Sequence, residues 1–152
     1  MGIFSSSIKI DKNNKNLKIA IITSEWNSII TNNLLSKTIE TLTKYGVKKT
    51  NISEYKVPGS FELIYASKKI AKNKGINVII TIGCIIKGDT PHFEYICESV
   101  TNGIKDLNIL LDIPVIFGVL TTQNLEQAKK RSEGNSNKGR EFAISALKMT
   151  KI

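Results

Sequence analysis

The sequence predicts a three-layer α/β/α sandwich, in which helices cover both faces of a mostly parallel four-stranded sheet. Short runs of β-branched residues alternate along the chain with longer segments of helical periodicity. Such alternation implies right-handed crossovers and therefore parallel strands. The 152 residues, of which 41% are hydrophobic, are enough for one globular core. We therefore expect a single domain over residues 17–152, preceded by a polar N-terminal tail over residues 1–16.

The elements follow in a regular order after the tail, which contains at most a short edge strand at residues 8–10. Strands are predicted from β-branched composition at residues 18–23, 52–57, 78–82 and 115–120. Helices are predicted from the spacing of apolar residues at 28–45, 60–73, 91–107, 124–131 and 138–149. Gly46 ends the first helix, and Gly83 and Gly88 are expected to allow tight turns after the third strand.

The segment from residue 83 to residue 95 is the most informative for function. Thr90 and Pro91 have the form of a helix N-cap followed by proline at the first helical position. The backbone N–H groups of that helix start are then free to hold a phosphate. His92, the only histidine, lies in the same turn, where the helix dipole disfavours the imidazolium and leaves a neutral base. The segment predicts an anion site beside a proton-transfer group, although a purely structural His92 is the alternative.

Further candidate residues follow the other predicted strands, at the edge of the sheet where ligands bind in folds of this kind. Each alone has a structural explanation, because Trp26, Phe61 and Phe117 are typical core aromatics. Glu62 alone would be an ordinary acidic residue in the first turn of a helix, stabilised by the helix dipole. The coincidence of four motifs, at 24–27, 58–62, 88–92 and 117–122, favours a ligand pocket at this edge.

The net charge of +9 comes from twenty lysines and two arginines against 13 acidic residues. The lysines are scattered, so the charge indicates a compositional bias and argues against nucleic-acid binding. Against this background, Arg131 and Arg140 are candidates for a planar, bidentate contact. No apolar run reaches the length of a membrane span and no signal-peptide pattern is present, so we expect a cytoplasmic protein without a membrane partner. Cys84 and Cys97 are expected to be reduced thiols.

In combination and order, the motifs resemble those of the 6,7-dimethyl-8-ribityllumazine synthase family over residues 18–149. The resemblance implies a flavodoxin-like fold and a transferase of riboflavin biosynthesis. The family condenses 5-amino-6-(D-ribitylamino)uracil with 3,4-dihydroxy-2-butanone 4-phosphate to 6,7-dimethyl-8-ribityllumazine, releasing phosphate and water, with no metal and no organic cofactor. The segments that carry the resemblance are 26–27, 57–62, 83–95, 114–122, 126–131 and 137–139.

The resemblance also implies how the substrates are held. Residues on the pyrimidine side would stack on the ring, bind the ribityl hydroxyls and form an apolar wall; they are Trp26, Ser60, Phe61, Glu62, Ile85 and Ile86. His92 would be catalytic and shuttle protons, while Asp89 and Thr90 would offer helix-start amides to the phosphate. The neighbouring subunit would contribute a further set, in which the arginine clamps the phosphate; this set is Phe117, Arg131 and Lys138.

The family pattern implies a homopentamer. It leaves open whether pentamers form a sixty-subunit shell and whether riboflavin synthase is a partner. Several departures bear on this. Trp26 replaces the commoner phenylalanine, Lys87 replaces arginine, and the carboxylate of Asp89 is unfavourable beside a phosphate unless it points away or caps the helix. The loop at 132–136 is one residue shorter than the common form, so the higher assembly is open. The alternatives are a flavin- or nucleotide-binding module of flavodoxin-like architecture and a shell protein without activity.

Overall fold

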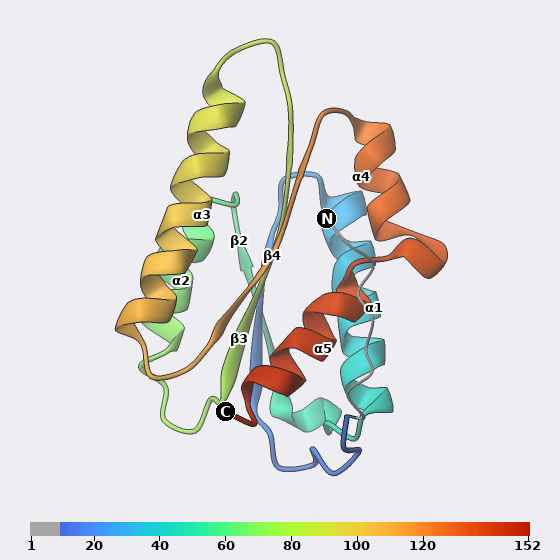
Figure 1. Ribbon diagram of the computed structural model, residues 1–152, viewed down its shortest axis with the longest axis vertical. Coiled ribbons are helices and arrows are strands. Elements are labelled where there is room, and N and C mark those ends of the chain that lie inside the picture. Colours follow the sequence, from blue (N-terminus) through green and yellow to red (C-terminus); the bar gives the residue numbers. More distant parts are fainter. Residues whose placement is uncertain (1–9) are drawn as a thin grey trace.

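The computed structural model describes residues 10–152 and has the predicted three-layer α/β/α architecture (Figure 1). Its strands are β1 (Ile19–Ser24), β2 (Ile52–Val57), β3 (Val78–Ile86) and β4 (Val115–Thr122). They form one sheet in the order β2-β1-β3-β4, and every neighbouring pair in this sheet is parallel. The edge strand predicted at 8–10 lies outside the described residues except for Ile10.

Helices cover both faces of this sheet. The face on the left of Figure 1 carries α2 (Glu62–Ile70) and α3 (His92–Leu110). The opposite face carries α1 (Ser28–Lys44), α4 (Leu125–Ser132) and α5 (Gly139–Met149). Two short 3₁₀ helices, η1 (Lys49–Asn51) and η2 (Gly134–Ser136), lie before β2 and between α4 and α5. The layers confirm the flavodoxin-like fold expected from the sequence.

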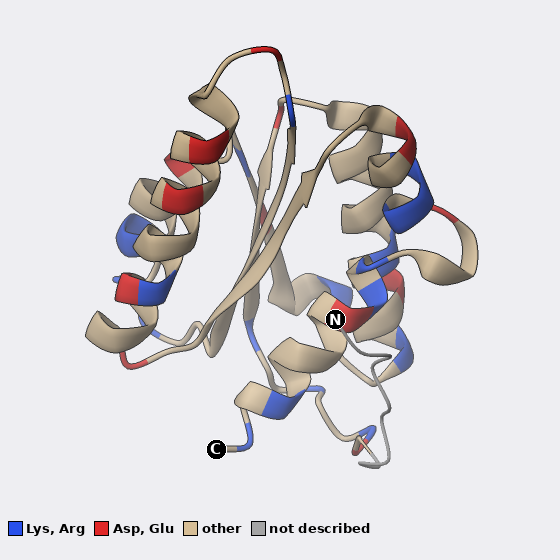
Figure 2. Cartoon of the chain, turned by 45° about the horizontal axis from the view of Figure 1, so that its top comes forward, with Lys and Arg blue, Asp and Glu red and all other residues tan. Residues whose placement is uncertain are grey.

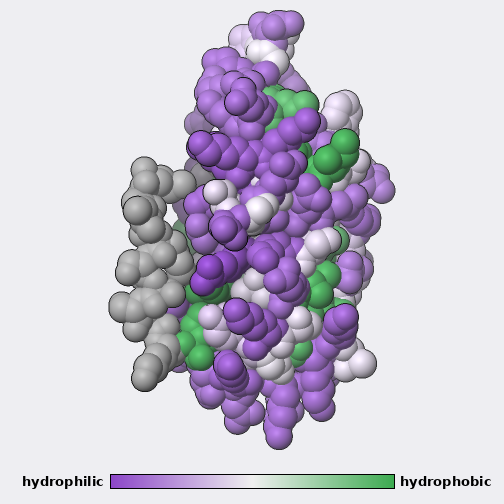
Figure 3. Space-filling view, turned by 90° about the vertical axis from the view of Figure 1, so that its right-hand side faces the viewer, coloured by the Kyte–Doolittle hydropathy of each residue, from purple (hydrophilic) through white to green (hydrophobic). Residues whose placement is uncertain are grey.

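The core consists of two apolar clusters, one on each side of the sheet. Successive residues of β1 point to opposite sides, so Ile21 packs with the α1 layer and Ile22 with α2 and α3. Every residue of β1 is buried, as expected for a central strand with helices on both faces. The outer surface of the α1, α4 and α5 layer is mainly hydrophilic (Figure 3). These helices therefore turn their apolar sides to the sheet.

β3 continues past its predicted end at residue 82 and reaches Ile86. Its last residues pair with β4 alone, because the pairing with β1 stops at Ile82. Gly83 therefore lies inside the strand, and the prediction that it forms a turn was wrong. A Cβ at Gly83 would lie 2.5 Å from Oγ of Ser60, so close packing requires the glycine. Gly88 lies in the following loop without a positive φ, so its turn does not need glycine either.

The chain before β1 packs against the C-terminal end of α1. The buried side chain of Asn14 donates hydrogen bonds to the backbone carbonyls of Asp11 and Tyr45, at 2.6 and 2.8 Å. Gly46 ends α1 as predicted, with a φ of 93° that favours glycine. A Cβ at Gly46 would also collide with the carbonyl of Lys12. Residues 11–14 are thus fastened to the end of α1.

Candidate active site

A cavity of about 510 Å³ opens at the carboxyl end of the sheet, and we call it the edge pocket. Its walls come from the β1–α1 turn, the β2–α2 turn, the end of β3 and the first turns of α3. The residues that line it are Trp26, Asn27, Gly59, Ser60, Phe61, Glu62, Cys84, Ile85, Ile86, His92 and Ile96. The strand-end motifs of the sequence therefore meet in one place, with the exception of the motif after β4.

The β1–α1 turn is fixed on both sides, which places Trp26 at the mouth of the edge pocket. On one side, the backbone N–H of Trp26 donates to the carbonyl of Pro58 at 3.2 Å. On the other side, the Asn27 carboxamide donates to the carbonyl of Cys84 at 2.9 Å. Asn27 has a φ of 56°, a left-handed conformation that asparagine tolerates better than most residues. The Trp26 indole is 73% exposed, so its ring is free to stack on a ligand.

The β2–α2 turn supplies the polar side of the pocket. Oε2 of Glu62 accepts a hydrogen bond from the backbone N–H of Gly59 at 2.8 Å, which holds the carboxylate at the pocket. Ser60 is buried against Gly83 of β3, while the Phe61 ring is half exposed. The turn thus presents a hydroxyl, a carboxylate and an aromatic ring from consecutive residues.

The end of β3 and the start of α3 form the remaining wall. Ile85 and Ile86 are half-buried and apolar, and Cys84 is buried. Burial raises the pKa of the Cys84 thiol to about 11, so this side chain is neutral and a poor nucleophile. His92 is the first residue of α3 and is exposed at the pocket. The wall is apolar at its base and carries the imidazole at its rim.

The start of α3 differs from its predicted form. The helix begins at His92, Pro91 stands at the N-cap position, and no side chain of residues 10–152 caps the helix. The prediction that Thr90 is the capping residue was therefore wrong, and both Thr90 and Asp89 are exposed and lie outside the edge pocket. The N–H of Glu94 donates to the carbonyl of Pro91 at 3.1 Å, whereas the preceding amides of the turn, those of His92 and Phe93, remain available to an anion.

An ion pair spans the loop between β3 and α3. Nζ of Lys87 lies 3.0 Å from Oε1 of Glu94 and 6.0 Å from the centre of the Phe93 ring. The hydrogen bond from Lys87 lowers the pKa of the Glu94 carboxyl. The backbone N–H of Lys87 also donates to the carbonyl of Thr122 in β4, at 2.9 Å. The strand end and the first turn of α3 are joined across the loop that carries Asp89.

Besides Asp89 and Thr90, three further predicted site residues do not line the edge pocket of this chain. Phe117 lies on the edge strand β4 and is 40% exposed. Arg131 is exposed in the last turn of α4, where its Nη1 donates to the Gln127 carbonyl at 3.2 Å. Lys138 precedes α5, and its Nζ lies 2.7 Å from Oε1 of Glu141. The single chain therefore brings the pyrimidine-side residues together with His92, and leaves these three elsewhere.

The pocket also contains residues that were not predicted as site residues. Asn27, Gly59, Cys84 and Ile96 line it. The position of Asn27 directly after Trp26 at a strand end was a usable signal, because asparagine often occupies a left-handed turn. Ile96 follows His92 by one helical turn, which places both side chains on one face of α3. Cys84 had no distinguishing signal, since its predicted position was a loop.

The charged residues are spread over both helical layers (Figure 2). The last turn of α4 carries Lys129, Lys130 and Arg131, while the first turn of α3 carries Glu94. Within residues 10–152, His, Cys, Asp and Glu side chains form no group of three that could hold a metal ion. In the same part of the chain, no helix combines the length and the apolar character needed to cross a membrane.

Comparison with known proteins gives a consistent match. A family model described as 6,7-dimethyl-8-ribityllumazine synthase matches residues 16–152. A protein of that name from Flavobacterium psychrophilum is 54% identical over 138 residues, covering 90% of this chain and 73% of the relative. A protein of the same name from Bacteroides fragilis is 51% identical over 134 residues, covering 88% of this chain and 94% of that relative. The chain belongs to the 6,7-dimethyl-8-ribityllumazine synthase family.

Proposed function

We propose that this chain uses the edge pocket to condense 5-amino-6-(D-ribitylamino)uracil with 3,4-dihydroxy-2-butanone 4-phosphate, giving 6,7-dimethyl-8-ribityllumazine, phosphate and water. Family membership over nearly the whole chain makes it a transferase of riboflavin biosynthesis with small-molecule substrates. The observation that supports the location is the cavity in which Trp26, Glu62 and His92 meet. The reaction as proposed involves no metal and no organic cofactor.

The pyrimidine substrate would occupy the part of the pocket near the β1–α1 and β2–α2 turns. The exposed indole of Trp26 offers a face on which the ring can stack. Glu62 binds the Gly59 amide through Oε2, so Oε1 remains as an acceptor for a ribityl hydroxyl. Ser60 adds a hydroxyl that both donates and accepts, as a polyol requires. Phe61 would shield the ring, and Ile85 with Ile86 would form the apolar wall.

His92 would move the protons of the reaction. Imine formation, elimination of phosphate and ring closure each require a proton to leave or reach a substrate atom, and a positioned imidazole serves all three steps. Its place at the rim of the pocket, exposed and in the first turn of α3, allows exchange with both substrate and solvent. The uncapped amides of the same turn would sit beside it to receive the phosphate.

The phosphate would be held at the β3–α3 loop by the amides near Asp89 and Thr90 and by a cation from the neighbouring subunit. Asp89 is exposed, so its carboxylate can point away from the anion. Arg131 is the candidate cation, because among residues 10–152 no carboxylate lies within ion-pair distance of it. Lys138 would assist after exchanging its bond to Glu141 for the substrate, and Phe117 would close the pocket from the same subunit.

A homopentamer is the proposed assembly, with pockets shared between adjacent subunits. Large apolar side chains exposed on this chain support it, because a monomer gains nothing from exposing them. They include Tyr65 on α2, Tyr95, Ile109 and Leu110 on α3, and Phe117 on β4. We further propose that pentamers assemble into a sixty-subunit shell with riboflavin synthase as a partner, and that the protein is cytoplasmic.

Turnover of the two substrates tests the proposal. Purified protein mixed with both substrates should give the absorbance and fluorescence of the lumazine, and Trp26→Ala should weaken binding of the pyrimidine by removing the stacking face. Ile29→Ala is a matched control, because Ile29 is equally exposed nearby without lining the pocket. Binding of a flavin or nucleotide without turnover would favour the binding-module alternative and contradict the proposal.

A further inference from the structure

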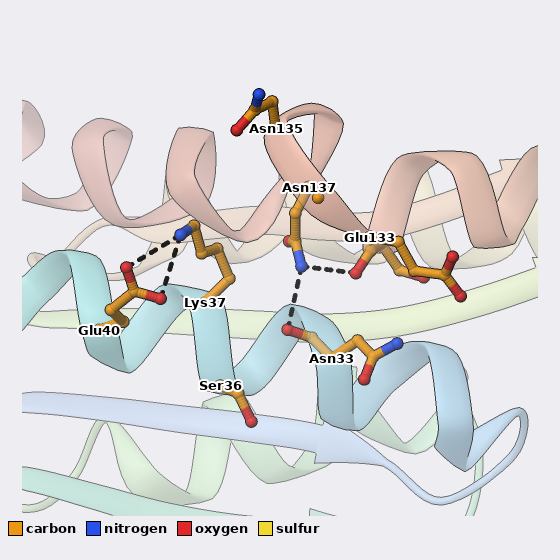
Figure 4. A pocket seen from close by; sticks show the side chains of 9 residues that line it. Asn33, Ser36, Lys37, Glu40, Glu133, Asn135 and Asn137 are labelled. Atoms are coloured by element: carbon orange, nitrogen blue, oxygen red, sulfur yellow. Dashed lines mark hydrogen bonds and ion pairs between the residues drawn. The ribbon is translucent and has the colours of Figure 1, made fainter.

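Asn137 lies between Arg131 and Lys138 in the connection from α4 to α5. Residues 133–136 of this connection are exposed, whereas Asn137 itself is only 9% exposed. In Figure 4 its side chain points from the connection towards α1 and Asn33. This buried carboxamide therefore lies between the exposed Arg131 and the half-buried Lys138, and its hydrogen bonds show what it holds in place.

The carboxamide of Asn137 joins three backbone segments. Its Nδ2 donates to the carbonyl of Ser132, at 2.5 Å, and to the carbonyl of Asn33 in α1, at 3.2 Å (Figure 4). Its Oδ1 accepts from the N–H of Gly139, at 2.9 Å. Ser132 directly follows Arg131, and Gly139 directly follows Lys138. The side chain therefore fixes the ends of α4 and α5 relative to each other and to α1.

One further backbone hydrogen bond completes this link. The N–H of Lys138 donates to the carbonyl of Arg131 at 2.8 Å, so the two cationic residues are bonded through their main chains. The Arg131 guanidinium donates to the Gln127 carbonyl one turn earlier, so its location follows that of the helix end. Movement of the Ser132 carbonyl would therefore move the guanidinium as well.

The docking of α5 on α1 has supports that do not involve Asn137. Oγ1 of Thr38 donates to the carbonyl of Gly139 at 3.1 Å and to the carbonyl of Leu34 at 2.8 Å. The packing is close, because a Cβ at Gly139 would collide with the carbonyl of Leu34. What Asn137 adds is a side-chain contact to the end of α4, through the Ser132 carbonyl, beside the main-chain bond from Lys138 to Arg131.

We propose that Asn137 is a positioning residue for the cationic pair Arg131 and Lys138, and that its N–H groups hold the end of α4 where Arg131 can reach the substrate phosphate. This inference rests on the proposed function, in which these cations bind the phosphate of the butanone substrate. A carboxamide is suited to the task, because it donates to two carbonyls and accepts from one amide at the same time.

Asn137→Asp tests the inference with the least damage to the fold. Aspartate caps a helix as well as asparagine does, so the bond from the Gly139 amide is kept. Both donated bonds are lost, and the carboxylate faces the Ser132 and Asn33 carbonyls instead. We expect the KM for the butanone phosphate to rise about tenfold, while the KM for the pyrimidine changes less than about twofold, because only the former substrate carries the phosphate.

Two control variants separate this effect from charge and from loss of stability. Asn135→Asp places the same charge in the same connection at an exposed position, and should leave both KM values within about twofold. Thr38→Val removes a buried hydroxyl from the α1–α5 contact, and should lower the melting temperature without a selective change in KM. Titration of wild type and Asn137→Asp with inorganic phosphate gives a readout that requires no turnover.

The outcomes distinguish the two proposals. Wild-type protein without turnover would overturn the proposed function, whereas phosphate binding that is equally tight in wild type and Asn137→Asp would overturn the inference. Equal KM changes for both substrates, a matching effect of Asn135→Asp, or failure of Asn137→Asp to fold while Thr38→Val folds would show a merely structural residue. A selective rise for the butanone phosphate, together with weaker phosphate binding, would support the positioning role.

Discussion

Replacing Gly83 with alanine should destabilise the protein through one contact with Ser60. The new Cβ would lie 2.5 Å from Oγ of Ser60, and 3.3 Å from both Cβ of Ser60 and Cδ1 of Leu63. Most of the strain therefore falls on the hydroxyl. Overpacking of a buried site costs about 1–3 kcal/mol, whereas alanine in place of a strand glycine gains about 0.5–1 kcal/mol. We expect the free energy of unfolding to fall by about 1–2 kcal/mol.

A second substitution isolates the contact. In a Ser60→Ala background the hydroxyl is gone, and the nearest remaining atoms lie at the tolerable 3.3 Å. Gly83→Ala should then be neutral or stabilise the protein by up to about 1 kcal/mol. The effect of Gly83→Ala on the free energy of unfolding therefore depends on whether Ser60 is present, which is the coupling that a double-mutant cycle measures. Gly88→Ala is the matched control, because a Cβ at Gly88 meets no atom within 4 Å and its φ is not positive.

Urea denaturation of the four proteins of the cycle, with equal m values, measures this coupling. The strain also has a functional consequence, because relief requires Ser60 to move within the pocket wall. The KM for the pyrimidine should rise in Gly83→Ala more than the KM for the butanone phosphate. The same loss of stability in both backgrounds would refute the reasoning, since the Ser60 hydroxyl would then not be the source of the strain.

The remaining predictions concern single side chains. His92→Ala should lower kcat by about 10²-fold or less, because positioning survives the loss of acid–base assistance; unchanged kcat would make His92 structural. Arg131→Ala should raise the KM for the butanone phosphate far more than that for the pyrimidine, with partial recovery in Arg131→Lys; equal changes would reject the clamp. Cys84 has a pKa raised to about 11 from 9.0. Between these values the unfolded chain binds fewer protons, so wild-type stability should fall with rising pH by up to about 3 kcal/mol relative to Cys84→Ala; parallel pH curves would contradict this.

Periodicity predicted the layers of the fold because each helix and strand has its own apolar pattern. It failed at the end of β3, where residues beyond Ile82 pair only with β4. The two glycines there suggested a turn, but Gly83 is needed for the approach of Ser60. Such a requirement arises between segments far apart in sequence, so no local pattern reveals it.

Sequence patterns likewise predicted part of the candidate site and missed the rest. Strand-end motifs predicted that Trp26, Glu62 and His92 would meet, because the carboxyl ends of parallel strands share one edge. The hydrogen bond from Asn27 to the Cys84 carbonyl joins residues 57 positions apart, and no sequence pattern indicates it. Arg131 lies on the other side of the sheet from α3. Its proposed role therefore depends on a second subunit, and the pattern of strands and helices in one chain does not predict where that subunit lies.

Complementation between two poorly active variants tests the shared pocket most directly. If His92 and Arg131 act together only across a subunit boundary, co-expressed His92→Ala and Arg131→Ala chains form some boundaries at which both residues are intact. In a cyclic ring with random mixing at equal amounts, about a quarter of the boundaries meet this condition. Lumazine formation should then exceed the mean of the two separate variants and approach about a quarter of the wild-type rate. Activity that stays at the mean of the variants, in rings shown to contain both chains, would contradict the account.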